Sequence, residues 1–198
     1  GESPGFFAAA DDAGVWRHPV VVRLFGASPT NPFRRFLADA ERFAVLLDAL
    51  PQVLCHRDAD PDNLRLGSGA DGAPETIALD WALAGIGPVG EDLAALASAA
   101  FLNVGDAERE PVQEALLHGY RDGLAEAGWR GDERLFRLGF SAAAALRLGL
   151  LSLPFLERRL AGGEGDLPAD RLFARAAAFV SRSAADAWML ADALGARP

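Results

Sequence analysis

The sequence predicts a mostly helical α+β fold, and three observations lead to this class. Apolar residues recur at three- and four-residue steps over residues 91–194, which predicts several helices. Short apolar runs alternate with segments rich in Gly, Asp and Pro over residues 53–83, which predicts strands and loops. Helical spacing also fills residues 31–50. With 198 residues, 51% of them apolar, the chain has enough material for the core of one domain.

The first elements follow from local signals. Residues 1–14 are small and acidic and lack an apolar period, so we interpret residues 1–30 as a leader or the remnant of a preceding segment. The apolar run 20–25 is too short to separate a strand from a buried helix. Asn31 followed by proline is typical of a helix start, and we expect one amphipathic helix from there until Pro51 ends it.

The remaining elements are expected in two groups. Three short strands are predicted at residues 53–55, 64–66 and 76–79. After Gly90 the chain is expected to be helical, with Gly105, Gly128 and a later pair of glycines between the helices. The four predicted helices cover residues 91–103, 107–127, 132–160 and 168–194.

Composition excludes several classes of function. Acidic residues outnumber basic ones 28 to 19, and the net charge of −9 repels phosphate backbones and anionic membranes, so we expect no nucleic-acid partner. Cys55 is alone and cannot form an internal disulfide, and no secretion segment is apparent, which favours a cytoplasmic protein. Arg147 and Pro154 interrupt the most apolar stretch, so no membrane span is predicted. All basic residues are arginine, which excludes lysine chemistry for this chain.

The polar residues that could take part in catalysis or metal binding lie in the strand region. Asp58 begins a tight polar loop, Asn63 stands where the next strand starts, and Asp80 ends the strand after that. We expect these three oxygen-bearing side chains to converge. Mg²⁺ prefers oxygen ligands, so one carboxylate and one amide beside the phosphates of a nucleotide would form half of a metal site. The remaining aspartate could then deprotonate an attacking hydroxyl.

This pattern, H-x-D-x-x-x-x-N followed by an aspartate after a β-hairpin, resembles the catalytic loop of the protein-kinase-like superfamily. The surrounding residues narrow the resemblance to the aminoglycoside phosphotransferase family. They are Val53-Leu54-Cys55-His56 before the loop, Pro61 ahead of the asparagine, Asp80-Trp81 in place of D-F-G, and Gly90-Glu91-Asp92-Leu93-Ala94 shortly afterwards. Arg57 occupies a position that is often glycine in this family.

The resemblance implies a role for each of these residues. Asp58 would be the catalytic base, and Asn63 and Asp80 would be Mg²⁺ ligands next to ATP. His56 would tie the loop to the strand of the metal site, and Asp92 would accept hydrogen bonds from the backbone of the loop. Trp81 would pack under the metal-binding aspartate. The implied function is transfer of the γ-phosphoryl group of ATP to a hydroxyl group of a small molecule.

One feature of the family is missing. Its N-terminal lobe carries a sheet that covers ATP and a lysine that contacts the phosphates, but only about 55 residues precede His56 and none is a lysine. We therefore interpret residues 31–198 as a kinase-like C-terminal lobe without its N-terminal lobe, and expect this chain to be inactive by itself. The alternative is a non-catalytic binding or regulatory module with a kinase-like fold.

Other motifs in the region have simpler explanations. The spacing of Asp58, Asp60 and Asp62 imitates a calcium-binding loop, but glycine is absent from its sixth position and glutamate from its twelfth. The G-x-G-x-x-G pattern that starts at Gly67 precedes a strand rather than a helix, so we interpret it as a hairpin turn. Cys55 is expected to be a core residue. Whether Asp60 and Asp62 face solvent or position a substrate, and whether the acidic surplus serves a cationic substrate, stays open.

Overall fold

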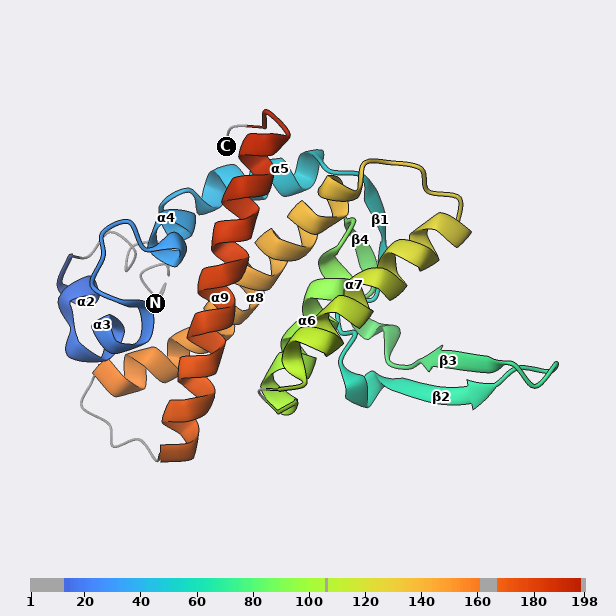
Figure 1. Cartoon of the computed structure of the whole chain (residues 1–198), viewed down its shortest axis with the longest axis horizontal. Helices are drawn as coiled ribbons and strands as arrows, with labels where there is room; N and C mark the ends of the chain where they lie inside the picture. Colours follow the sequence, from blue (N-terminus) through green and yellow to red (C-terminus); the bar gives the residue numbers. More distant parts are fainter. Residues whose placement is uncertain (1–12, 106, 161–166, 197–198) are drawn as a thin grey trace.

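The computed structural model describes residues 13–105, 107–160 and 167–196. These residues form mostly helices together with two small antiparallel sheets, as Figure 1 shows. The predicted α+β class is therefore confirmed. Of the leader or remnant predicted over residues 1–30, residues 1–12 lie outside the described part of the chain.

Two short helices come first, α2 (Ala13–Arg17) and α3 (Pro19–Phe25). The apolar run 20–25, which the sequence could not assign to a strand or a helix, is thus a helix. His18 explains its start, because the imidazole Nδ1 accepts a backbone N–H of the first turn at 3.3 Å. Trp16 and Val21 are buried in the common core, and α3 packs against the last helix of the chain. The residues before position 31 therefore contact the proposed lobe, and the boundary between the two stays a prediction.

The single helix predicted over residues 31–50 is wrong in one respect, because it is divided into α4 (Pro32–Ala38) and α5 (Ala40–Ala49). Asn31 starts α4 as expected, and its side-chain oxygen accepts two backbone N–H groups of the first turn at 2.9 and 3.1 Å. The backbone of Asp39 leaves the helical conformation, with φ −107° and ψ 14°, and so ends α4.

Aromatic side chains on the two sides of the break after α4 pack on each other. Phe36 before it and Phe43 after it are both fully buried, and their ring centroids lie 4.6 Å apart. Phe43 also meets Trp188 of the last helix edge to face at 5.5 Å.

The strands form two separate pairs. Strand β1 (Gln52–Cys55) pairs antiparallel with β4 (Gly85–Pro88), and β2 (Leu64–Ser68) pairs with β3 (Pro74–Ala78). The three predicted strands overlap β1, β2 and β3. Strand β4 was missed, because its sequence Gly-Ile-Gly-Pro has no apolar alternation. The glycine-rich segment is the turn of the β2–β3 hairpin, as predicted, and this hairpin projects from the body of the molecule (Figure 1).

The four helices predicted after residue 90 are confirmed to within two residues at each end. Helices α8 and α9 pack along each other, α6 packs on α8, and α4 packs against α9 (Figure 1). Within the described residues, none of the helices combines the length and hydrophobicity that crossing a bilayer requires. The helices are α6 (Glu91–Asn103), α7 (Arg109–Glu126), α8 (Glu133–Leu160) and α9 (Leu167–Ala193).

Two glycines bring the start of α6 into contact with α8. A Cβ atom on Gly139 of α8 would lie 1.9 Å from the carbonyl oxygen of Val89, and one on Gly90 would lie 2.3 Å from that of Phe136. Gly90 also has φ +99°, which disfavours any other residue. This close approach fixes the first turn of α6, and that turn carries Asp92.

Candidate active site

The loop after β1 carries the predicted catalytic residues, and the ring of His56 holds it in place. His56 is buried, and its Nε2 atom lies 2.7 Å from the carbonyl oxygen of Leu79. The backbone N–H of Asp58 donates to Nδ1 at 3.3 Å. A carbonyl only accepts and an N–H only donates, so this geometry fits the tautomer with its proton on Nε2. His56 therefore connects the loop to the residue before Asp80, as the resemblance implied.

Asp92 holds the same loop from the side of α6. One carboxylate oxygen accepts the backbone N–H of His56, and the other accepts that of Arg57, both at 2.7 Å. Asp92 stands in the first turn of α6, where the partial positive charge of the helix terminus also favours a carboxylate. These are the two backbone bonds that the resemblance implied for this residue.

Arg57 adopts a backbone conformation that glycine reaches without strain. Its φ is +65°, in the left-handed region, which costs a residue with a Cβ about 1–2 kcal/mol. The side chain turns back over β4, where it donates to the carbonyl oxygen of Ile86 at 2.7 Å. Its Nε atom lies 3.4 Å from a carboxylate oxygen of Glu91. The strained residue is thus held through both its backbone and its side chain.

Asp58 and Asn63 are in direct contact. The amide nitrogen of Asn63 donates to the Asp58 carboxylate at 2.9 Å and to the Asp58 carbonyl oxygen at 2.9 Å. A short 3₁₀ turn (Pro61–Asn63) brings the asparagine into position. Asp60 caps that turn by accepting the N–H of Asp62 at 3.0 Å, so Asp60 has a structural function in the loop. The side chain of Asp62 is exposed.

Asp80 follows directly after a residue that is bound to this loop. The N–H of Leu79 donates to the carbonyl oxygen of Asn63 at 2.8 Å, and the carbonyl oxygen of Leu79 contacts His56. Asp80 itself is exposed and has φ +59°. Backbone bonds therefore tie the residue before Asp80 to the loop that carries Asp58 and Asn63, and the convergence of all three side chains stays a prediction.

Trp81 packs on the histidine of the loop. The two ring centroids lie 4.6 Å apart, and the indole N–H donates to the carbonyl oxygen of Ala78 at 3.0 Å. Half of the tryptophan side chain, 51%, remains exposed. Trp81 therefore covers one side of His56 while it presents its other side to solvent.

Sequence reasoning missed Arg147, which reaches the loop from the middle of α8. Its guanidinium donates to the carbonyl oxygen of Arg57 at 2.9 Å, and a second nitrogen lies 3.6 Å from the carboxylate of Asp58. The only signal in the sequence was a charged residue that interrupts the most apolar stretch of the chain. Sequence spacing could not reveal the contact, because the partners are 90 residues apart.

Cys55, the last residue of β1, lies directly before the loop. Cys55 is buried, and burial together with the nearby carboxylates of Asp92 and Glu91 raises the pKa of the thiol to about 11. A thiol with this pKa is protonated at neutral pH and is a poor nucleophile. The interpretation of Cys55 as a core residue is confirmed.

Two cavities lie near the helices. One, of about 360 Å³, is bounded by α5, α6 and α8, and both Arg57 and Arg147 line it. The other, of about 400 Å³, lies between α7 and α9 and contains carboxylates and guanidinium groups together. Its charged residues are Arg109, Glu110, Glu114, Arg182 and Asp186.

The contacts of the loop can be compared with the chemistry of a metal site. Among the described residues, no three side chains of His, Cys, Asp or Glu form a metal-binding cluster. The amide nitrogen of Asn63 makes both of its bonds to Asp58, so its amide oxygen is the atom left for a cation. Asp80 makes no side-chain bond that caps the turn after it. An amide oxygen and a carboxylate suit Mg²⁺, which usually takes only one or two protein ligands beside phosphates.

The sequence model of the phosphotransferase enzyme family (APH) matches residues 20–134, which is more than half of the chain. The chain belongs to this family, and its expected relationship to aminoglycoside phosphotransferases is confirmed. No curated protein and no solved structure matches the chain.

Proposed function

We propose that this chain is the C-terminal, kinase-like lobe of an enzyme that transfers the γ-phosphoryl group of ATP to a hydroxyl group of a small molecule. Membership of the phosphotransferase family supports phosphoryl transfer in general. The observation that carries the proposal furthest is the contact between Asp58 and Asn63 at 2.9 Å, next to the strand that leads to Asp80. This contact supports the proposal, because it puts the carboxylate of the proposed base within hydrogen-bond reach of the amide of one proposed metal ligand.

In this proposal Asp58 is the catalytic base. Its carboxylate is half-exposed and accepts a hydrogen bond from Asn63, which fixes its orientation and leaves acceptor capacity for an incoming hydroxyl group. The carboxylate would orient the hydroxyl and take its proton as the new O–P bond forms. Positioning of this kind supplies much of the rate acceleration in phosphoryl transfer.

Asn63 and Asp80 are the residues that would hold Mg²⁺, through an amide oxygen and a carboxylate. The bound cation supplies positive charge that offsets the negative charge of the phosphates. His56, Asp92 and Trp81 would contribute indirectly, since each holds the loop or the strand that carries these ligands.

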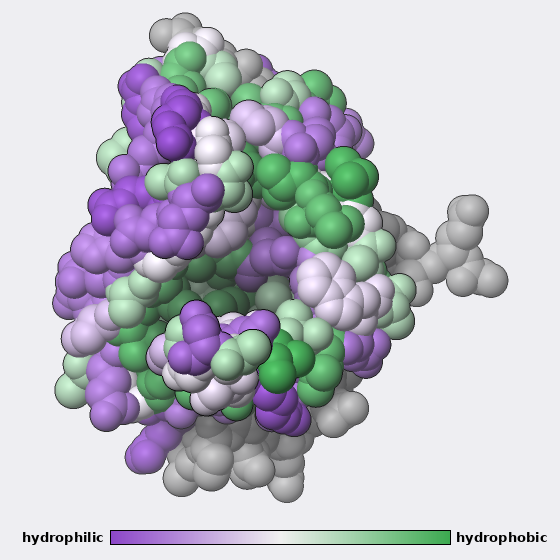
Figure 2. Space-filling model, turned by 90° about the vertical axis from the view of Figure 1, so that its right-hand side faces the viewer, coloured by the Kyte–Doolittle hydropathy of each residue, from purple (hydrophilic) through white to green (hydrophobic). Residues whose placement is uncertain are grey.

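We propose that exposed apolar side chains of the strand region contact the nucleotide base or a covering segment of protein. Of the exposed large hydrophobic side chains, the most exposed is Leu66 of β2, at 89%. Figure 2, viewed along the projecting hairpin, shows hydrophobic residues gathered on this face. Apolar patches of this kind commonly form binding surfaces. The residues of this region that contribute are Leu54, Leu66, Ile77, Leu79, Trp81, Leu83 and Ile86.

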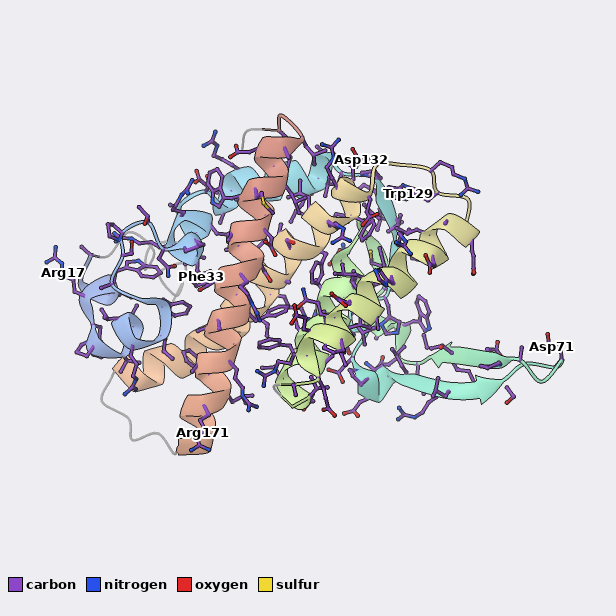
Figure 3. The ribbon with its side chains drawn as sticks, viewed as in Figure 1. Arg17, Phe33, Asp71, Trp129, Asp132 and Arg171 are labelled. Carbon is purple, nitrogen blue, oxygen red and sulfur yellow. The ribbon has the colours of Figure 1, made fainter. Side chains whose placement is uncertain are left out.

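Binding of Mg²⁺ and ATP can be tested on this chain even when affinity is weak. We expect millimolar ATP with Mg²⁺ to shift the backbone NMR signals of residues 56–64 and 79–82. We expect Asp80→Asn to remove most of the chemical-shift change that depends on Mg²⁺. Asp71→Asn is the matched control, because Asp71 lies at the far end of the hairpin and an asparagine can keep its bond to the N–H of Ala73 (Figure 3). Equal responses in the two variants would contradict the assignment of Asp80.

The transfer step needs a second measurement. ADP release should require an acceptor, for which aminoglycosides, sugars, choline and homoserine are a suitable panel, and should be measured on the protein together with any lobe that covers its nucleotide. We expect Asp58→Asn to reduce turnover at least a hundredfold and Asp71→Asn to leave it unchanged. Turnover of Asp58→Asn within a few fold of the unmodified protein would overturn the role of the base. Absence of any Mg²⁺-ATP response would favour the non-catalytic module instead.

A further inference from the structure

Arg147 makes two contacts with the catalytic loop, and both involve atoms next to the proposed base. One nitrogen of the guanidinium donates to the carbonyl oxygen of Arg57 at 2.9 Å. Another lies 3.6 Å from a carboxylate oxygen of Asp58. The peptide that joins Arg57 to Asp58 is thus held from α8.

The peptide groups around Arg57 are held on both sides by charged groups. Asp92 accepts the N–H of Arg57 at 2.7 Å, and Arg147 donates to its carbonyl oxygen at 2.9 Å. A residue with φ +65° is strained and stays in that conformation only when its surroundings enforce it. Asp92 and Arg147 together supply that constraint, and the carboxylate of Asp58 takes its direction from the same peptide.

From these contacts we propose that Arg147 is a positioning residue, which aims the carboxylate of Asp58 by holding the preceding peptide. This inference rests on the proposed function, because it assigns Arg147 to the base of that reaction. Arg147 would act through the loop and not through substrate. Its guanidinium has the planar fork of donors that can hold a carbonyl and a carboxylate at the same time.

The environment of Arg147 favours this role over simple packing. Arg147 and Arg57 line the cavity of about 360 Å³ between α5, α6 and α8, so empty space, rather than packed side chains, lies beside the loop on this side. Arg137 of the same helix behaves differently, because it forms an ion pair with Glu133 one turn away and stays on its own helix.

Arg137 therefore provides a matched control, since both arginine side chains are 39% exposed. Hydrogen exchange measured by mass spectrometry should show the loop peptide, residues 56–63, exchanging about tenfold faster in Arg147→Met. Peptides of α6 and α9 should be unaffected. Arg137→Met should leave the loop at its original rate, and Arg147→Lys should restore part of the protection, because lysine keeps one charged donor.

This exchange experiment does not depend on enzymatic activity, so it distinguishes failure of the positioning role from failure of the proposed function. Loop exchange that is the same in Arg147→Met and Arg137→Met would overturn the proposal. If Arg147→Met accelerates exchange throughout the protein, the variant is destabilised as a whole, and Arg147→Lys becomes the deciding test. Uniform acceleration in Arg147→Lys would also overturn the positioning role of Arg147.

Turnover adds a second readout that a merely structural residue would not produce. We expect Arg147→Met to lower kcat between tenfold and a hundredfold, with the KM for ATP changed less than threefold, because a misdirected base slows the chemical step and leaves nucleotide binding intact. Arg147→Lys should recover part of the loss in kcat. A rise in KM with unchanged kcat would contradict positioning of the base.

Discussion

The carboxylate of Asp92 and the left-handed backbone of Arg57 are hydrogen-bonded at 2.7 Å, and the second oxygen of Asp92 binds the neighbouring N–H of His56 at the same distance. Asp92→Asn keeps the size of the side chain but has one acceptor oxygen, so one backbone N–H loses its partner. We expect a loss of about 1–3 kcal/mol in the free energy of unfolding, measured by urea denaturation. Asp71→Asn should unfold at the original urea concentration, and equal midpoints for the two variants would contradict this account.

A pair of substitutions at Arg57 tests the strain in the loop. Arg57→Ala and Arg57→Gly both remove the guanidinium with its contacts to Ile86 and Glu91, so those losses cancel in the comparison. Only alanine keeps a Cβ in a conformation with φ +65°. We expect the glycine variant to be more stable than the alanine variant by about 1 kcal/mol in urea denaturation. At ordinary positions alanine is the better residue, so an alanine variant of equal or higher stability would show that the loop relaxes out of this conformation.

How much of this molecule could be predicted depends on the range of the interactions involved. Helices α6 to α9 were located from apolar spacing and from the glycines between them, because both are local properties of the sequence. The loop of Asp58 and Asn63 was located from its motif, since five residues of separation suffice to bring the two side chains together. Strand β4 was missed because it pairs with β1, which is about thirty residues earlier, and two of its four residues are glycine.

The features that sequence could not provide depend on contacts across the fold. The break at Asp39 lies between Phe36 and Phe43, whose rings pack on each other, and Phe43 also meets Trp188 of a helix at the other end of the chain. The contact of Arg147 with the loop depends on the path of α8 past α6. Neither leaves a periodic signal in the sequence, because each is set by how separate elements approach one another.

The close approach of α8 to the start of α6 makes Gly139 sensitive to substitution. A Cβ there would lie 1.9 Å from the carbonyl oxygen of Val89, and backbone atoms cannot rotate away as a flexible side chain can. We expect Gly139→Ala to lower the free energy of unfolding by about 2 kcal/mol or more and to reduce protection of the loop held by Asp92.

Gly119 provides the control for this substitution. It lies within α7, and a Cβ there would meet no atom within 4 Å. Gly119→Ala should therefore raise the stability by about 0.5–1 kcal/mol through the better helix propensity of alanine. The opposite signs at two helical glycines distinguish a steric effect from a propensity effect. Stabilisation by both substitutions would show that α8 and the start of α6 can separate without cost.

Cys55 gives the chain a pH-dependent reporter of folding. Burial, aided by Asp92 and Glu91, raises the pKa of its thiol from 9.0 to about 11, so ionisation favours the unfolded chain. The stability that depends on this thiol should be fully present below pH 9.0 and should be lost as pH rises toward 11. At pH 9.0 the thiolate fraction in the unfolded chain exceeds that in the folded chain by roughly fiftyfold, and burial slows reaction further.

We therefore expect a disulfide reagent such as dithiobis(nitrobenzoate) to react with the folded protein at least fiftyfold more slowly than with the protein in urea. Cys55 is the only cysteine in the chain, so the absorbance change reports on this residue alone, and Cys55→Ala should give no signal. Rates within a few fold of each other would mean that β1 and β4 open readily beneath the catalytic loop. The same opening would loosen the bonds of Asp92 to His56 and Arg57, since Cys55 directly precedes them.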